Sequence, residues 1–204
     1  MSGRRSWVGV WLVATLLATG SLAGSQSSCS RTSPPGPSPL SSASAEAGPP
    51  IDPPLLAFLS RARSAHHRAD AFEEQGHLGR AIVELMRVID GPLPRPNDPY
   101  PETREVLADT HARLADLRSR QGQFEEALSD IQAGLGLAAE PTYFRGHLFE
   151  VKGLVEERRS QALREAGDDA GSERARQHAL EAFDQAMTIQ AKVIESALSE
   201  EGPR

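Results

Sequence analysis

The chain has 204 residues, a formal net charge of −6, and only 5% aromatic residues. This length allows one domain with tails, and the acidic balance disfavours a nucleic-acid partner, which usually needs a basic surface. The single cysteine, Cys29, excludes a disulfide within the chain.

Residues 1–29 have the layout of an export signal. Arg4 and Arg5 precede an uncharged, mostly apolar run, and small residues follow it. Glycines interrupt the run, and it is short for a spanning helix, which needs about 20 apolar residues. A secretory signal is therefore predicted. Ordinary cleavage near residues 21–23 and an uncleaved anchor are the alternatives.

The position of Cys29 after this run resembles the cleavage site of bacterial lipoprotein signals. In that family the cysteine becomes the lipidated first residue, so the resemblance implies lipidation of Cys29 and attachment to a membrane through the N-terminal anchor. Gln26 departs from the family, which usually has leucine or a similar residue there. Ser30 replaces the aspartate that commonly retains lipoproteins at the inner membrane. The implied location is the bacterial cell envelope, at the periplasmic face of the outer membrane.

Residues 30–54 are predicted to be a disordered linker rich in proline and serine. Eight of the 15 prolines lie between Pro34 and Pro54. Proline removes backbone donors, and the segment has almost no large apolar residues with which to build a core. We expect it to act as a spacer between the anchor and the rest of the chain.

Residues 55–199 are predicted to form an all-α domain. Apolar residues recur there at three- and four-residue spacing in six segments, which is typical of amphipathic helices. Breaks are expected at Gly76, at residues 91–101, at Gly122, at residues 140–141 and at a polar turn over 167–172. Ser172 is predicted to cap the last helix. Residues 200–204 are expected to fray.

A short pattern occurs twice, as Gly76–Ala81 and Gly122–Ala127: glycine, any residue, a large apolar residue, two further residues, then alanine. Six helices in three hairpins with this turn pattern resemble the tetratricopeptide repeat (TPR) family. The resemblance implies three antiparallel helical hairpins stacked as a short, divergent TPR-like α-solenoid. The residues that carry it, as turn and packing positions, are Ala69, Gly76, Ala81, Ala115, Gly122, Ala127, Gly153 and Ala179.

The spacing of the repeats departs from the family. Ala81, Ala127 and Ala179 are 46 and 52 residues apart, whereas the family repeats about every 34 residues. We assign the excess to the loop at 91–101 and to longer helices plus the 167–172 turn in the third unit. A plain helical bundle, which obeys the same packing rules, is the alternative.

Catalytic, metal-binding and cofactor-binding motifs are not evident in the sequence. The six histidines form no pair with convergent ligand spacing on one helix, and neighbouring His66 and His67 point about 100° apart on a helix. The chain contains neither a glycine-rich phosphate loop nor a nucleophile motif. We therefore expect no catalytic residues, no metal and no cofactor.

The TPR resemblance implies instead that the first helix of each hairpin lines a concave groove for a protein partner. The candidate groove residues are Arg63, His66, Asp70, Glu73, Asp109, Asp116, Arg120, His147 and Glu150. This set has an acidic excess, which favours a partner segment of basic or polar character.

The sequence thus predicts a non-catalytic protein–protein interaction scaffold or adaptor of the bacterial cell envelope. In this interpretation a membrane-tethered TPR lipoprotein assists the assembly or stability of an envelope complex. A self-associating structural protein, paired through the apolar end of the helix at 174–199, is the main alternative. An envelope enzyme is a further one.

Overall fold

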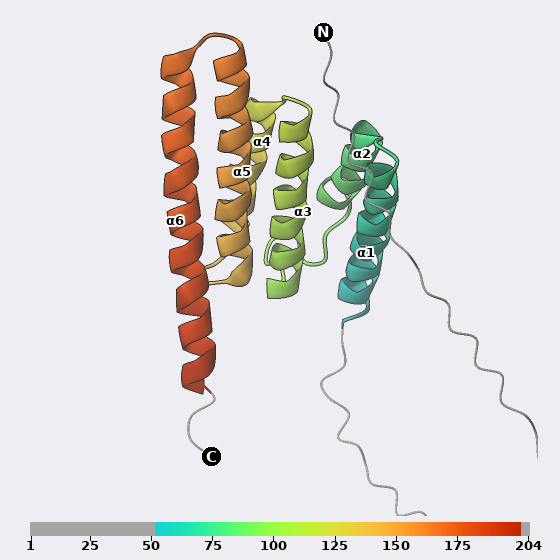
Figure 1. Cartoon of the computed structure of the whole chain (residues 1–204). Coiled ribbons are helices and arrows are strands. Elements are labelled where there is room, and N and C mark those ends of the chain that lie inside the picture. Colours follow the sequence, from blue (N-terminus) through green and yellow to red (C-terminus); the bar gives the residue numbers. More distant parts are fainter. Residues whose placement is uncertain (1–51, 201–204) are drawn as a thin grey trace, which may run out of the picture. The chain divides into compact units, whose positions relative to one another are not determined.

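The computed structural model describes residues 52–200, and in this range the chain is entirely helical. The predicted signal at 1–29, the lipidation candidate Cys29, most of the 30–54 linker and residues 201–204 lie outside the described residues. The helices are α1 (Pro53–Glu74), α2 (Leu78–Ile89), α3 (Pro101–Arg120), α4 (Phe124–Leu137), α5 (Tyr143–Glu165) and α6 (Asp169–Glu200). The prediction of an all-α fold is confirmed for this range (Figure 1).

The six helices form three hairpins, α1–α2, α3–α4 and α5–α6, that lie side by side in chain order (Figure 1). Helix α3 packs on both helices of the first hairpin, and α5 packs on both helices of the second. The domain bounds differ slightly from those predicted. Helix α1 begins at Pro53 instead of residue 55, because a proline in the first turn loses no helical hydrogen bond. Helix α6 extends to Glu200, the first residue of the predicted frayed tail.

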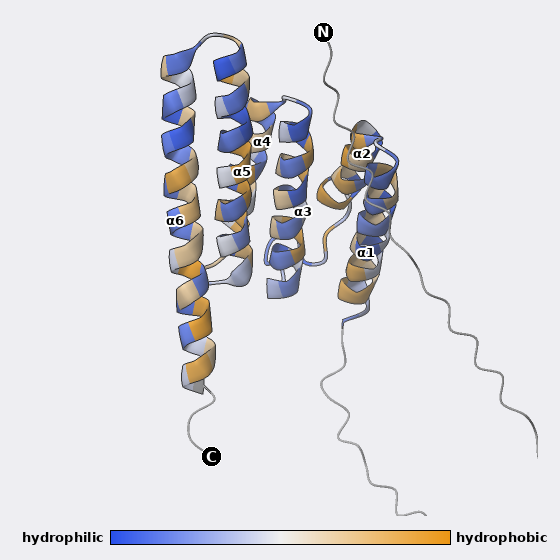
Figure 2. Ribbon diagram, viewed as in Figure 1, coloured by the Kyte–Doolittle hydropathy of each residue, from blue (hydrophilic) through white to orange (hydrophobic). Residues whose placement is uncertain are grey.

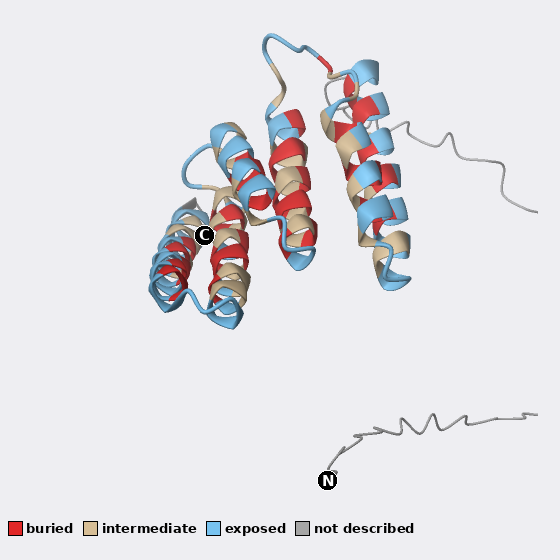
Figure 3. Ribbon diagram, turned by 90° about the horizontal axis from the view of Figure 1, so that it is seen from above, coloured by how far each residue is buried: buried red, intermediate tan, exposed pale blue. Residues whose placement is uncertain are grey.

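Small residues allow the helices within the first two hairpins to approach closely. Ala69, Ala81, Ala115 and Ala127 are all fully buried, as predicted for packing positions. Larger side chains fill the space around them, and buried residues face the neighbouring helices (Figure 3). The leucine side chains of α3 connect the first two hairpins, since Leu114 packs in one cluster with Ala69 and Ala81.

The three hairpin turns have the same backbone structure. Gly76, Gly122 and Gly167 have φ angles of 75°, 77° and 82°, which favour glycine. In each turn the glycine N–H donates to the carbonyl three residues earlier, and the following N–H donates to the carbonyl five residues earlier. These two hydrogen bonds define the Schellman motif that ends a helix. The sequence identified this role for the first two glycines only.

The predicted 167–172 turn and the capping role of Ser172 are wrong. Three residues join α5 to α6, as in the other hairpins, and α6 begins at Asp169. Asp168 caps it, because its side-chain Oδ1 accepts the N–H of Gly171 at 2.8 Å. Ser172 lies inside α6 and is buried.

The third hairpin is therefore in a different register from the one predicted. The turn glycines are 46 and 45 residues apart, a nearly constant period. Ser160 and Ser172 stand at the positions of Ala69 and Ala81, seven residues before and five residues after the turn glycine. Gly153 and Ala179 are buried but do not form this pair. Gly153 instead accommodates the ring of Phe183, which a side chain at this position would overlap.

Candidate functional site

One face of the first helices carries an ion pair that recurs between hairpins. Arg113 of α3 donates to Asp70 of α1 at 2.6 Å, and Arg158 of α5 contacts Asp116 of α3 at 2.8 Å. The aspartate is six residues before its turn glycine in both cases, and the arginine is nine residues before the next one. The same contact therefore joins hairpin one to hairpin two and hairpin two to hairpin three.

Further pairs extend this network along the same helices. Arg120 contacts Glu73 at 2.7 Å and Asp116 at 3.5 Å. The hydrogen bond to Glu73 raises the pKa of Arg120 above its ordinary value. The structure thus brings together four predicted groove residues, Asp70, Glu73, Asp116 and Arg120, but pairs them with one another and with arginines.

The acidic excess predicted for the groove is smaller than the sequence count indicates. Arg113, which the count leaves out, contacts Asp70 and also lies 3.6 Å from Glu73. Arg158 balances Asp116 from the neighbouring helix. A side chain that a single-helix count places on the same face is invisible as a partner until the helices are packed. The acids facing α3 and α5 are therefore largely neutralised.

Next to this network lies a hollow of about 390 Å³ between α1 and α3. Leu59 and Val106 contribute apolar surface, and Phe144 of α5 reaches it as well. Arg63, His66 and Asp109, all predicted groove residues, line its polar part. Arg63 makes a long hydrogen bond of 3.4 Å to His67, and Asp109 lies 3.8 Å from His66. These two charges are held less tightly than those of the ion-pair network.

His66 is the most constrained polar group of this hollow. The Thr110 hydroxyl donates to the Val106 carbonyl at 2.7 Å, so its oxygen accepts the His66 Nε2–H at 2.9 Å. The lone pair of Nδ1 then faces Arg113, whose Nη1 is 3.3 Å away. Burial and the charge of Arg113 lower the pKa of His66, against an opposing effect of Asp109. The ring is therefore neutral at pH 7, with Nδ1 as an acceptor.

His147 and Glu150 do not join the hollow. They contact each other at 3.4 Å, one turn apart on α5. With Gly167 as the turn glycine, the positions equivalent to Arg63 and His66 are Leu154 and Glu157, so the predicted third-unit groove positions are seven residues too early. The cause is the unrecognised third turn.

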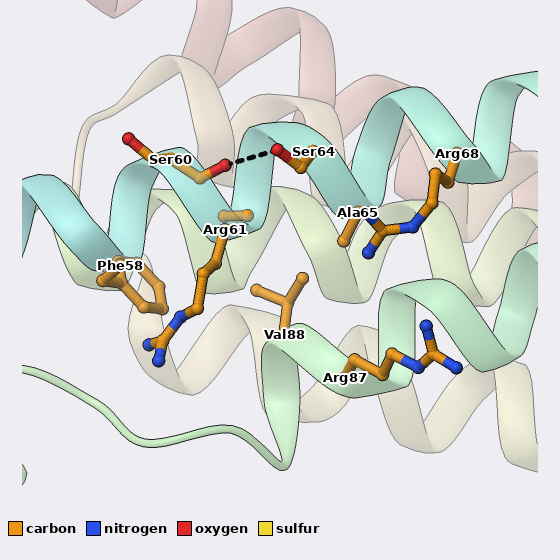
Figure 4. Close-up of a pocket in the computed structure, with 9 residues that line it drawn as sticks. Phe58, Ser60, Arg61, Ser64, Ala65, Arg68, Arg87 and Val88 are labelled. Carbon is orange, nitrogen blue, oxygen red and sulfur yellow. Dashed lines mark hydrogen bonds between the residues drawn. The ribbon is translucent and has the colours of Figure 1, made fainter.

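Sequence reasoning missed a second hollow, of about 360 Å³, between α1 and α2. Val88 and Phe58 supply its apolar surface, and arginines flank it (Figure 4). Its three arginines are already engaged: Arg68 and Arg87 donate to the buried Glu84, and Arg61 donates to the Pro92 carbonyl.

The position of these arginines in the repeat explains the second hollow. Arg61 and Arg68 occupy the positions of Leu107 and Leu114, which bury their side chains against the first hairpin. Since α1 has no preceding hairpin among the described residues, these positions are polar. Alignment of the units on their turn glycines is the sequence signal that could have revealed them.

Within residues 52–200, no three His, Cys, Asp or Glu side chains are grouped as metal ligands. None of the six described helices is both long and apolar enough to cross a membrane. Fold and site together define an all-helical protein of three hairpins with a charged face and a partly apolar hollow. Comparison of the chain with protein-family models, with curated proteins and with solved structures finds no match.

Proposed function

We propose that this chain is a non-catalytic scaffold that binds a segment of a partner protein in the hollow between α1 and α3. The observation that carries the proposal is the composition of that hollow. It combines apolar surface from Leu59, Val106 and Phe144 with two weakly paired charges, Arg63 and Asp109. Binding sites of this kind are concave and mostly apolar, with a few polar groups that fix orientation.

We propose further that the three hairpins are TPR-type repeats stacked as a short α-solenoid. Three features support this: the glycine turns at 46- and 45-residue spacing, the small-residue pairs on either side of each turn, and the recurrent Asp–Arg contact. In repeat proteins each unit buries its apolar surface against its neighbours, as α3 and α5 do. The longer period, compared with about 34 residues in the family, makes this a divergent member.

The chemistry of the hollow favours a partner segment with an apolar side chain between polar groups. The apolar side chain would cover Leu59 and Phe144, while Asp109 and His66 Nδ1 would accept hydrogen bonds. A basic group on the partner would meet Asp109, and an acidic one would meet Arg63. The partner is therefore of basic or polar character near Asp109, with the acidic network of Asp70 and Glu73 already occupied.

A photo-crosslinking side chain at position 63 in intact cells tests this site. We expect adducts with a partner protein, and we expect Asp109→Lys in the same chain to reduce them about tenfold. Glu126→Lys on α4 makes the same charge change at an exposed position away from the hollow and is the control. Equal adducts in the chain with and without Asp109→Lys would remove the hollow from the binding site.

We also propose that the scaffold is a membrane-tethered lipoprotein of the bacterial cell envelope, at the outer membrane, where it helps to assemble or stabilise an envelope complex. The support is the resemblance of the sequence around Cys29 to lipoprotein signals. Mass measurement of the mature N-terminus tests it: we expect an acylated Cys29, and Cys29→Ser should release the chain from the membrane fraction. An unmodified N-terminus elsewhere would end the tether proposal without affecting the hollow.

A further inference from the structure

Helix α6 carries an exposed apolar stripe that nothing in the described residues covers. Leu180, Met187, Ile194 and Leu198 expose 48%, 61%, 60% and 67% of their surface. Their spacing of seven, seven and four residues places them along one line of the helix. Figure 2 shows hydrophobic residues at the C-terminal end of α6. Exposed apolar surface organised in this way is typical of an interaction site.

The stripe lies largely on a part of α6 that the other hairpins lack. Helices α2 and α4 have 12 and 14 residues, whereas α6 has 32. The opposite side of α6 is buried against α5 through Ala179, Ala182 and Ala186. Near the start of α5, Gly146 lies against Ile189 and Gln190, so the helix continues past α5 beyond these residues (Figure 1). Packing within the chain therefore does not explain why α6 is so long or why its free side is apolar.

We propose that this stripe pairs with the same stripe of a second copy of the chain, with the two α6 helices antiparallel. A two-fold axis at Met187 places Leu180 opposite Ile194 of the other copy. The surface is then self-complementary, as a two-fold dimer interface must be. The stripe from Leu180 to Leu198 is about 27 Å long.

The charges beside the stripe select this orientation and register. Lys192 is the only basic residue between 180 and 200, where the acids are Glu181, Asp184, Glu195 and Glu200. Glu181 and Lys192 are 11 residues, or three turns, apart and so lie on the same side of the helix. An antiparallel pair centred on Met187 brings Glu181 of each copy next to Lys192 of the other. A parallel pair leaves them at different heights.

The size of the contact predicts a reversible dimer. Two helices touching over this length bury roughly 1,000 Å² in total, near the lower limit of specific interfaces. Such a dimer is concentration-dependent. It would present two copies of the hollow between α1 and α3, but it does not depend on the function of that hollow.

Thiol cross-linking tests the register on the purified full chain, as the producing cell processes it, with Cys29→Ser so that introduced cysteines are the only thiols. We expect Met187→Cys to cross-link to itself with a short bis-maleimide. Leu180→Cys should cross-link to Ile194→Cys in a mixture of the two variants, and much less in either variant alone. Val83→Cys, at an exposed residue of α2, is the control. Equal cross-linking of the Val83 and Met187 variants would overturn the proposal.

Sedimentation equilibrium tests the association itself. We expect the unsubstituted chain to dimerise and Met187→Glu to weaken the dimer at least tenfold, with Val83→Glu as the matched control and circular dichroism as the check on folding. Lys192→Glu should weaken the dimer, and Glu181→Lys added to it should restore the dimer. A monomer at all concentrations, or an association that Met187→Glu leaves unchanged, would show that another surface or another occupant is involved and would refute the pairing.

Discussion

Ser160 Oγ donates to the carbonyl of Ser172 at 2.8 Å and lies 3.0 Å from Ser172 Oγ. Both serines are buried at the point where the first two hairpins have pairs of alanines. The third hairpin thus keeps the close approach of its helices but adds hydrogen bonds to it. Since both side chains are small, the helices remain as near to each other as in the alanine-paired hairpins.

We predict that Ser160→Ala lowers the free energy of unfolding by about 1 kcal/mol, because it removes the hydrogen bonds and leaves Ser172 Oγ buried without this partner. The double variant Ser160→Ala with Ser172→Ala recreates the alanine pair and should lose less than the sum of the two single changes. Urea unfolding measures both. A double variant that loses the full sum would mean that the two hydroxyls act independently.

Gly167→Ala is expected to destabilise the chain by about 1 kcal/mol or more, because alanine is strained at its φ of 82°. Gly136→Ala is the matched control, since Gly136 is in α4 and a Cβ there meets nothing within 4 Å. That change should stabilise the chain by up to about 1 kcal/mol. Thermal unfolding of both variants checks this, and the same sign for both would contradict the turn assignment.

The glycine at 153 is expected to be required by its neighbour. In Gly153→Ala the new methyl group overlaps the Phe183 ring, so we predict a loss of about 1–3 kcal/mol. Phe183→Leu added to it should recover part of the loss, because the shorter side chain makes room for the methyl group. Denaturant unfolding of the single and double variants measures the coupling, which should vanish if α5 and α6 do not pack at this point.

Asp130 is a buried carboxylate held from two sides. Arg118 donates to it at 2.6 Å and His111 Nδ1 lies 3.1 Å from it. Asp130→Ala leaves Arg118 without this partner, and we expect a loss of about 3 kcal/mol. The control is Glu125→Gln, at an exposed ion pair with Arg159, which should change stability by less than about 0.5 kcal/mol. Similar losses for both variants would argue against burial as the cause.

The lowered pKa of His66 makes stability depend on pH. Between its folded-state pKa and the unfolded value of 6.5, the unfolded chain binds the proton more readily, so stability falls as the pH falls below about 6.5. We predict a smaller loss between pH 7.5 and 5.5 for His66→Gln than for the unsubstituted chain. His67→Gln, at an exposed neighbour, is the control. Equal slopes for all three proteins would show that His66 is not the group responsible.

The local parts of the fold were predictable from the sequence. The helix ends at Gly76 and Gly122 follow from local rules, since a glycine with positive φ closes a helix whatever it packs against. The burial of Ala69 and Ala115 follows from their place in an amphipathic pattern. The third turn was missed because Asp169 and Ser172 replace the apolar residue and the alanine that mark the other two. The groove was predicted in part, because Arg63, His66 and Asp109 come together but His147 and Glu150 do not.

The sequence by itself determined that the described chain is helical, where its first two hairpins turn and which alanines they bury, because these depend on residues within one helix turn of each other. Only the tertiary structure decided which charges remain available. Arg113 and Arg158 come from the neighbouring hairpins to neutralise Asp70 and Asp116, and the α1–α3 hollow forms beside them. It also decided that α6 outruns α5 and leaves Met187 and Ile194 uncovered. These results depend on contacts between residues 40 or more positions apart, which no local pattern records.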